Sequence, residues 1–141
     1  METNKKNLFL DDFRYPEDVT WVNLPKVKWE IVRSVGGFKE WVNLQGVPKI
    51  VAFDNDLLPE HYTPSLGLPI KDTGYEAALW LVELCEENNI EFPSWIIHSL
   101  NSKGVTRMRD LFNSREISWI KGLGYSYSDP EFKPHLIKKS L

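Results

Sequence analysis

Short, continuously apolar runs recur along this 141-residue chain and alternate with segments of helical period. The runs fall at residues 8–10, 50–53 and 94–97, and a fourth apolar segment falls at 29–33. Strands that are buried on both faces of a parallel sheet lack the apolar–polar alternation of half-exposed strands. We therefore expect four buried strands in these segments.

Taken in chain order, the second, third and fourth of these strands are each followed by a segment with helical spacing. Residues 38–45 end at Gly46, a typical C-cap residue, and residues 74–89 follow the capping box formed by Thr73 and Glu76. A third helix is expected after the Lys103–Gly104 turn, with an apolar face made of Val105, Met108, Leu111 and Phe112. Each helix would cover part of the sheet.

The remaining segments have weaker patterns. Residues 17–28 contain Pro25 and no period, which indicates a loop with at most a short helix. Residues 57–72 carry three prolines and His61, and a loop of this length is often functional. A last strand is expected near residues 117–120 or as a short extended piece at 125–127, followed by a basic tail at 133–141.

The alternation of strands and helices predicts an α/β fold with a mostly parallel sheet and helices on both faces. The chain length favours a single domain over residues 1–141. We expect its core at about 7–113 and a C-terminal extension at 114–141.

Composition restricts the function. A net charge of −3 disfavours wrapping of duplex nucleic acid by a basic surface, but it permits a local patch for a small phosphorylated ligand or an RNA end. The single cysteine, Cys85, falls in a helical pattern and is expected in the core of a protein from a reducing compartment. No signal peptide and no membrane-spanning run is visible, so we expect a cytoplasmic protein without a membrane partner.

Polar residues gather where three of the strands end. Asp11 and Asp12 follow the first strand, Asp54 and Asp56 follow the third, and the fourth is followed by His98, Ser99 and Asn101. In open parallel sheets the binding sites form beyond the carboxyl ends of the strands. Four clustered carboxylates repel one another, and a divalent cation with oxygen ligands relieves that repulsion. The alternative is that the acids are turn residues that face water.

Four motifs along residues 7–113 resemble the cyclic-phosphate-processing receiver-like domains, a divergent branch of the receiver superfamily of two-component signalling. The motifs of that branch are similar to L-x-L-D-D-x-R-x-P, F-D-H-D-L, T-G-x-x-A-A-x-W-L and I-H-S-x-N-x-x-G-x-x-x-M. This chain has LFLDDFRYP at 8–16, FDNDL at 53–57, TGYEAALWL at 73–81 and IHSLNSKGVTRM at 97–108. The resemblance implies a flavodoxin-like three-layer sandwich whose fifth strand is not defined by the sequence.

Two departures from the family pattern, and one from the pattern of receivers in general, affect the expected chemistry. Asn55 replaces the middle histidine of the second motif, and Arg107 stands where asparagine commonly precedes Met108. The lysine that receivers carry after their fifth strand has no counterpart, because Lys103 is near in motif order but not equivalent. Loss of that lysine argues against ordinary phosphorelay signalling.

The resemblance implies a metal-dependent phosphoesterase that acts on cyclic phosphates, such as RNA 2′,3′-cyclic phosphate ends or cyclic nucleotides. Under this interpretation Mg²⁺ or Mn²⁺ would be held by Asp11, Asp12, Asp54 and Asp56. Catalysis would involve Asp54, Ser99 and His98, the last as a general acid or simply as a satisfied buried histidine. The phosphate would be bound by Arg14, Asn101, Lys103 and Arg107.

Three other functions fit the same residues. The pocket could bind and sequester a cyclic nucleotide without turnover. Asp54 could accept a phosphoryl group, as in a receiver that acts through a protein partner. The domain could also be an interaction module in which the acids have no chemical role.

Overall fold

The computed structural model describes residues 3–56, 73–115, 117 and 122–125. The loop at 57–72 with His61, most of the strand expected at 117–120 and the basic tail at 133–141 lie outside these described residues. No helix in the described part of the chain is both long and apolar enough to cross a bilayer.

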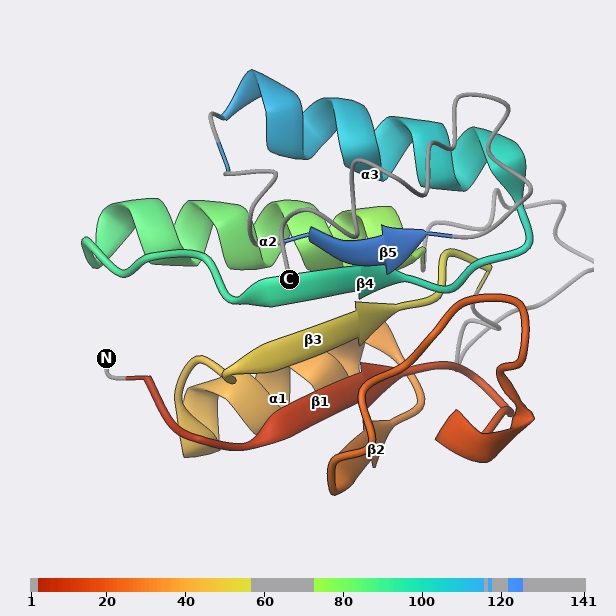
Figure 1. The fold of residues 1–141 in the computed structure, drawn as a ribbon. Helices are drawn as coiled ribbons and strands as arrows, with labels where there is room; N and C mark the ends of the chain where they lie inside the picture. The colour runs from red at the N-terminus through yellow and green to blue at the C-terminus, as the bar shows by residue number, and fades with distance from the viewer. Residues whose placement is uncertain (1–2, 57–72, 116, 118–121, 126–141) are drawn as a thin grey trace, which may run out of the picture.

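Five parallel strands form one sheet in the order β2-β1-β3-β4-β5 (Figure 1). They are β1 (Asn7–Leu10), β2 (Trp29–Val32), β3 (Ile50–Phe53), β4 (Ser94–Ile97) and β5 (Gly122–Tyr125). Four strands lie where the apolar runs predicted them. The fifth pairs with β4 through an irregular register and begins later than the 117–120 segment. The predicted receiver-like α/β fold is confirmed.

Three α-helices are described: α1 (Val35–Gln45), α2 (Gly74–Glu87) and α3 (Ser102–Ser114). Helix α1 begins three residues before the predicted start, because the Ser34 hydroxyl caps it by accepting a hydrogen bond from the Gly37 amide. Helix α3 also begins early, since the Asn101 side chain caps the Gly104 amide. Lys103 and Gly104 therefore lie in the first turn of α3 and not in a turn before it.

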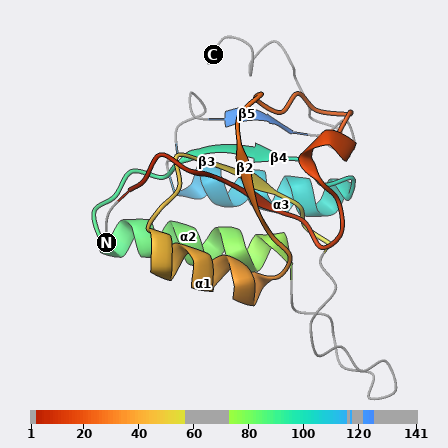
Figure 2. The same cartoon turned by 90° about the horizontal axis from the view of Figure 1, so that it is seen from below.

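All three helices pack on one face of the sheet, as the view in Figure 2 shows. For the described residues, the prediction of α-helices on both faces is therefore wrong. Their buried side chains join the strand residues that point to this face, including Leu8, Phe53 and Trp95. On the other face the described cover is the segment between β1 and β2, which contains the short 3-10 helix η1 (Pro16–Asp18). Proline and the absence of a helical period keep this segment from forming an α-helix.

The segment between β1 and β2 packs by scattered apolar side chains. Val19 is buried against Phe9, Ala52 and Ile96, and Trp21 packs on the same cluster. The indole Nε1 of Trp21 donates a hydrogen bond to the carbonyl oxygen of His98, at the end of β4, over 2.7 Å. The segment therefore holds itself against the same edge of the sheet at which β1, β3 and β4 end.

The amino end of α2 lies unusually close to the end of β3. A Cβ atom built on Gly74 would lie 1.5 Å from the backbone oxygen of Asp54, which no side-chain movement can relieve. Gly74 also donates its amide hydrogen to the Asn55 carbonyl oxygen over 2.9 Å. A residue without a side chain is therefore needed here to place the strand end that carries Asp54.

We predict that Gly74→Ala lowers the free energy of unfolding by about 1–3 kcal/mol or more, because the new methyl group must push strand and helix apart. Gly36→Ala is the matched control: its nearest new contact would be 3.9 Å away, so it should be neutral or stabilising by up to about 1 kcal/mol. Urea unfolding of both variants checks this. Equal stability of the two variants would contradict the close approach.

Candidate metal and phosphate site

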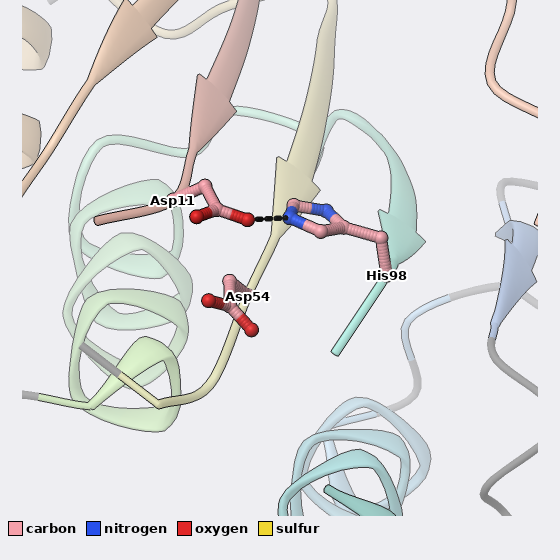
Figure 3. A group of neighbouring side chains, drawn as sticks. All are labelled: Asp11, Asp54 and His98. Atoms are coloured by element: carbon pink, nitrogen blue, oxygen red, sulfur yellow. Dashed lines mark hydrogen bonds and ion pairs between the residues drawn. The ribbon is translucent and has the colours of Figure 1, made fainter. Parts of the chain in front are cut away.

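Asp11 and Asp54 follow neighbouring strands at the same level of the sheet. The ladder pairs Leu10 of β1 with Phe53 of β3, so the next residue of each strand carries a carboxylate at the shared edge. Both side chains lie inside the protein, with Asp11 fully buried and Asp54 3% exposed. The predicted convergence of these two acids is what the structure shows (Figure 3).

Asp11 is stabilised as a carboxylate by several donors. Its Oδ1 accepts hydrogen bonds from the amides of Phe13 and Arg14, over 3.0 and 2.9 Å. Its Oδ2 lies 3.0 Å from Nε2 of His98 and 3.6 Å from the Arg14 guanidinium. Burial raises the pKa of Asp11, but the hydrogen bonds from His98, Arg14 and Phe13 outweigh it, so the pKa falls well below its usual range.

His98 is completely buried at the end of β4, and its ring stacks on that of Phe9 at 4.6 Å between centroids. Burial lowers the pKa of His98, and the neighbouring Asp11 carboxylate only partly opposes this. Its Nδ1 is buried without a hydrogen-bond partner among the described residues. A neutral ring that carries its proton on Nε2 fits both facts, because Nε2–H then donates to Asp11.

Asp54 has much weaker support than Asp11. Its Oδ1 accepts one short hydrogen bond from the amide of Asn55, over 2.8 Å. Burial, together with the nearby Asp11 charge, raises the pKa of Asp54 to about 7. In the metal-free protein a proton therefore occupies this carboxyl group over much of the acidic range.

Asp11, Asp54 and His98 each offer an atom within 4.8 Å of the others, which is close enough to surround one ion. Two buried carboxylates this close together repel each other, and a hard divalent cation bound by both would balance their charge. The Nε2 atom of His98 cannot donate to Asp11 and bind a cation at the same time. Asp11 and Asp54 are therefore the two residues of this group that could hold a cation, and His98 orients the Asp11 carboxylate.

The other two predicted metal ligands are not part of this three-residue group. Asp12 is half-buried. Asp56 is exposed, and its Oδ1 accepts hydrogen bonds from Asn101 over 3.0 Å and Asn55 over 3.4 Å. Asp56 thus links the end of β3 to the start of α3 in this structure.

The predicted phosphate-binding residues lie on the loops and helix ends around the carboxylates. Arg14 contacts one of them directly, since its guanidinium lies 3.6 Å from Oδ2 of Asp11. Lys103 and Arg107 are exposed on the first turns of α3, and Arg107 lies 4.2 Å from the ring centroid of Tyr75 on α2. Ser99 is fully buried and accepts a hydrogen bond from the Asn101 amide over 3.0 Å.

Asn101 is occupied within the protein at both ends of its side-chain amide. Its oxygen caps α3 by accepting from the Gly104 amide, and its nitrogen donates to Asp56. Contact with a phosphate would require the nitrogen to leave Asp56. The structure therefore gives Asn101 a positioning role, and its binding role stays a prediction.

Arg33, just after β2, was not a predicted site residue. Its Nη1 donates to the carbonyl oxygens of Asp11, over 3.1 Å, and of Arg14, and its guanidinium lies 4.7 Å from the ring centroid of Tyr15. It thereby fixes the turn that carries both acids of the first motif. No local pattern signals this role, because the contact joins residues about twenty positions apart.

Asn55, where the family pattern has histidine, is a structural residue in this chain. It is buried, and its oxygen accepts a hydrogen bond from the Tyr75 amide over 3.4 Å. A Cβ atom on Gly104 would lie 2.4 Å from its amide group, so α3 packs directly against it. Asn55 therefore joins the amino ends of α2 and α3 to the end of β3.

Comparison with protein families gives one result. Residues 6–114 match the model of the cyclic-phosphate processing receiver domain. This range contains β1 to β4, all three helices and every residue of the candidate site. No curated protein and no solved structure matched the chain.

The raised pKa of Asp54 predicts how metal-free stability depends on pH. The folded-state pKa of about 7 lies above the ordinary value of 3.8, so the folded state binds the extra proton between these pH values. Stability in EDTA should therefore fall as pH rises from about 4 to about 7, by at most about 4 kcal/mol, and should then level off. Urea unfolding at pH 5 and pH 8 measures the difference.

Asp54→Asn should remove this pH dependence and should stabilise the metal-free protein at pH 8. Asp110→Asn, on the exposed side of α3, is the control and should keep the wild-type dependence. If wild-type stability were the same at both pH values, the buried carboxyl group would not titrate as described.

Loss of Arg33 should loosen the turn that carries Asp11. We predict that Arg33→Gln weakens Mn²⁺ binding by about tenfold or more, as removal of residues that orient metal ligands typically does. Arg33→Lys keeps the charge but not the planar fork and should also bind more weakly than wild type. Isothermal titration measures the affinities, with Arg115→Gln as the control because Arg115 pairs with Glu86 on the surface. Unchanged affinity in both Arg33 variants would contradict this role.

Proposed function

The chain belongs to the family of cyclic-phosphate processing receiver domains, and from this we propose that it is a metal-dependent phosphoesterase that opens cyclic phosphates. The proposed substrates are RNA 2′,3′-cyclic phosphate ends or cyclic nucleotides. The observation that carries the proposal is the buried pair of carboxylates, Asp11 and Asp54, at the carboxyl edge of the sheet. We expect a cytoplasmic enzyme whose partner is a phosphorylated small molecule or an RNA end, without duplex DNA or membrane.

In the reaction, one P–O ester bond of the cyclic phosphate is broken and one P–O bond to the oxygen of water is formed. Water forms a new bond to phosphorus, the P–O bond to one ribose oxygen breaks, and a proton moves from the water to the leaving alkoxide. A bound Mg²⁺ or Mn²⁺ would neutralise phosphoryl charge and favour ionisation of water. The protein must supply the ligands, the orientation of the phosphate and a group that exchanges the proton.

Asp54 suits the centre of this site for two reasons. It lies beside Asp11, so both carboxylates can face one cation. Its pKa of about 7 in the metal-free state means that cation binding near neutral pH displaces a proton. Metal affinity should accordingly increase as pH rises toward about 7.

Cationic side chains around the carboxylates provide the charge that a phosphate needs. Arg14 lies next to Asp11, and Arg107 and Lys103 are exposed on the first turns of α3. The amino end of α3 adds amide donors at the same edge of the sheet. Asp11, Arg14 and the start of α3 thus offer sites for cation and phosphate within one region.

His98 has two candidate roles in this mechanism. As a general acid it would have to release Asp11 and reach the leaving oxygen from a fully buried position. As a positioning residue it keeps its hydrogen bond to Asp11 throughout. The short contact to Asp11 and the complete burial favour positioning.

The same site supports non-catalytic binding, in which a cyclic phosphate is held without turnover. It also supports acceptance of a phosphoryl group on Asp54. Binding alone gives no product and phosphoryl acceptance gives a phosphorylated protein, so one set of assays separates these functions from hydrolysis. An interaction module without site chemistry would bind neither cation nor phosphate.

We predict that the wild-type protein with Mn²⁺ converts 2′,3′-cyclic nucleotides and cyclic-phosphate RNA ends to linear monophosphates. Asp54→Asn should lower kcat by at least about a hundredfold, because it removes a carboxylate ligand of the cation. Phosphate release and chromatography of the products measure this. Tight binding without product would favour a sequestering protein, and stable labelling by a small phosphodonor would favour a receiver.

Two variants serve as controls in the same assay. Asp110→Asn, away from the site on α3, should keep full activity. His98→Gln keeps an N–H donor for Asp11 but cannot protonate a leaving group. Substantial activity in this variant is expected for a positioning residue, whereas its complete loss, with the metal affinity and the fold retained, would identify the general acid.

A further inference from the structure

Large apolar side chains are exposed at the edge of the sheet where the carboxylates lie. Among the described residues the exposed large hydrophobic side chains are Phe13, Tyr15, Val27, Leu44 and Leu100. Three of these five belong to the loops that follow β1 and β4, directly beside Asp11 and His98. All three therefore lie on segments that also carry residues of the candidate site.

Phe13 is the most exposed of these three, at 63%. Its position is fixed by its own backbone, since its amide donates to Oδ1 of Asp11 over 3.0 Å. The Arg14 guanidinium lies 4.6 Å from the centroid of the Phe13 ring and 3.6 Å from Oδ2 of Asp11. The cation therefore stands next to both the carboxylate and the aromatic ring.

From this geometry we propose that Phe13 is a specificity-determining residue that stacks on the nucleobase of the substrate. This inference rests on the proposed function, because it concerns the same site and the same substrates. A phosphate held at Arg14 and the carboxylates would place its attached nucleoside beside the neighbouring ring. The Phe13 ring offers an apolar surface to any base but has no donor or acceptor with which to read a base edge.

A nucleobase fits this position better than a protein surface does. The two neighbouring exposed side chains do not extend the Phe13 ring into a flat aromatic face: Leu100 is aliphatic, and the Tyr15 ring has the Arg33 guanidinium over it, as the Phe13 ring has that of Arg14. A ring with a guanidinium over one face and 63% of the residue exposed leaves room for one base beside one phosphate. A protein partner or a second copy of the chain would instead use a larger continuous apolar area.

Binding measurements on the whole protein test this without requiring turnover. In the presence of Mn²⁺, isothermal titration would compare adenosine 2′-phosphate, cytidine 2′-phosphate and inorganic phosphate. Phe13→Ala should weaken binding of both nucleotides by about tenfold or more, in line with the loss of one stacked base. Its affinity for inorganic phosphate should change less than about twofold, and Phe13→Trp should restore nucleotide binding.

Leu44→Ala is the control, because Leu44 is an exposed apolar residue on α1 and should affect none of the ligands. Equal weakening of nucleotide and phosphate in Phe13→Ala would overturn the proposal, since Phe13 would then only support Arg14. Unchanged nucleotide affinity, or no binding of nucleotides by the wild type, would also overturn it. So would a dimer that Phe13→Ala dissociates without any effect on nucleotides.

Failure of the proposed function has a different signature. The wild type would then bind nucleotides more tightly than phosphate but would convert no cyclic phosphate to product. In that case stacking at Phe13 would stand and the protein would be a binder. Turnover of cyclic phosphates with equal efficiency in wild type and Phe13→Ala, at unchanged KM, would keep the enzyme and remove the stacking role.

Discussion

The central constraint on this structure is the electrostatic repulsion between two buried carboxylates, which the fold does not remove. Asp11 and Asp54 are buried next to each other, and two carboxylates in such a place cannot both stay charged without compensation. Most of the compensating hydrogen bonds and charges are directed at one of them, Asp11. Asp11 receives two backbone amides, the His98 ring and a nearby guanidinium, whereas Asp54 receives a single amide. The resulting difference in pKa leaves one permanent carboxylate and one that gains or loses a proton near neutrality.

The rest of the fold holds this unequal pair in place. The parallel register of β1 and β3 sets the two strand ends level. Gly74 lets α2 approach the end of β3, and Asn55 ties that end to both α2 and α3. On the other face, Trp21 and Arg33 bind carbonyl oxygens of the residues that carry the site. These contacts are long-range, so the site is assembled only in the complete fold.

Strand positions and the meeting of Asp11 with Asp54 could be predicted from sequence, because buried parallel strands leave continuous apolar runs and their ends share an edge. The sequence could not predict which further acids face that edge. The chain leaves the strand after Asp11 and after Asp54, and the turns there decide where Asp12 and Asp56 point. Arg33 escaped prediction for a related reason: its partners are backbone carbonyls, which every residue has, so no side-chain type marks them.

Because Asn55 stands where the family pattern has histidine, fewer groups could transfer a proton in the proposed mechanism. Asn55 is enclosed by Gly104, Tyr75 and Asp56, and its amide cannot exchange a proton. Any proton transfer in this chain must therefore use another group. The Nε2 atom of His98 is already committed to Asp11, and burial keeps the ring neutral. Asp54 is the remaining described group of the three-residue cluster whose protonation changes near neutral pH. Because a bound cation would displace this proton, the ionisation of Asp54 would make metal affinity, and with it the proposed activity, depend on pH.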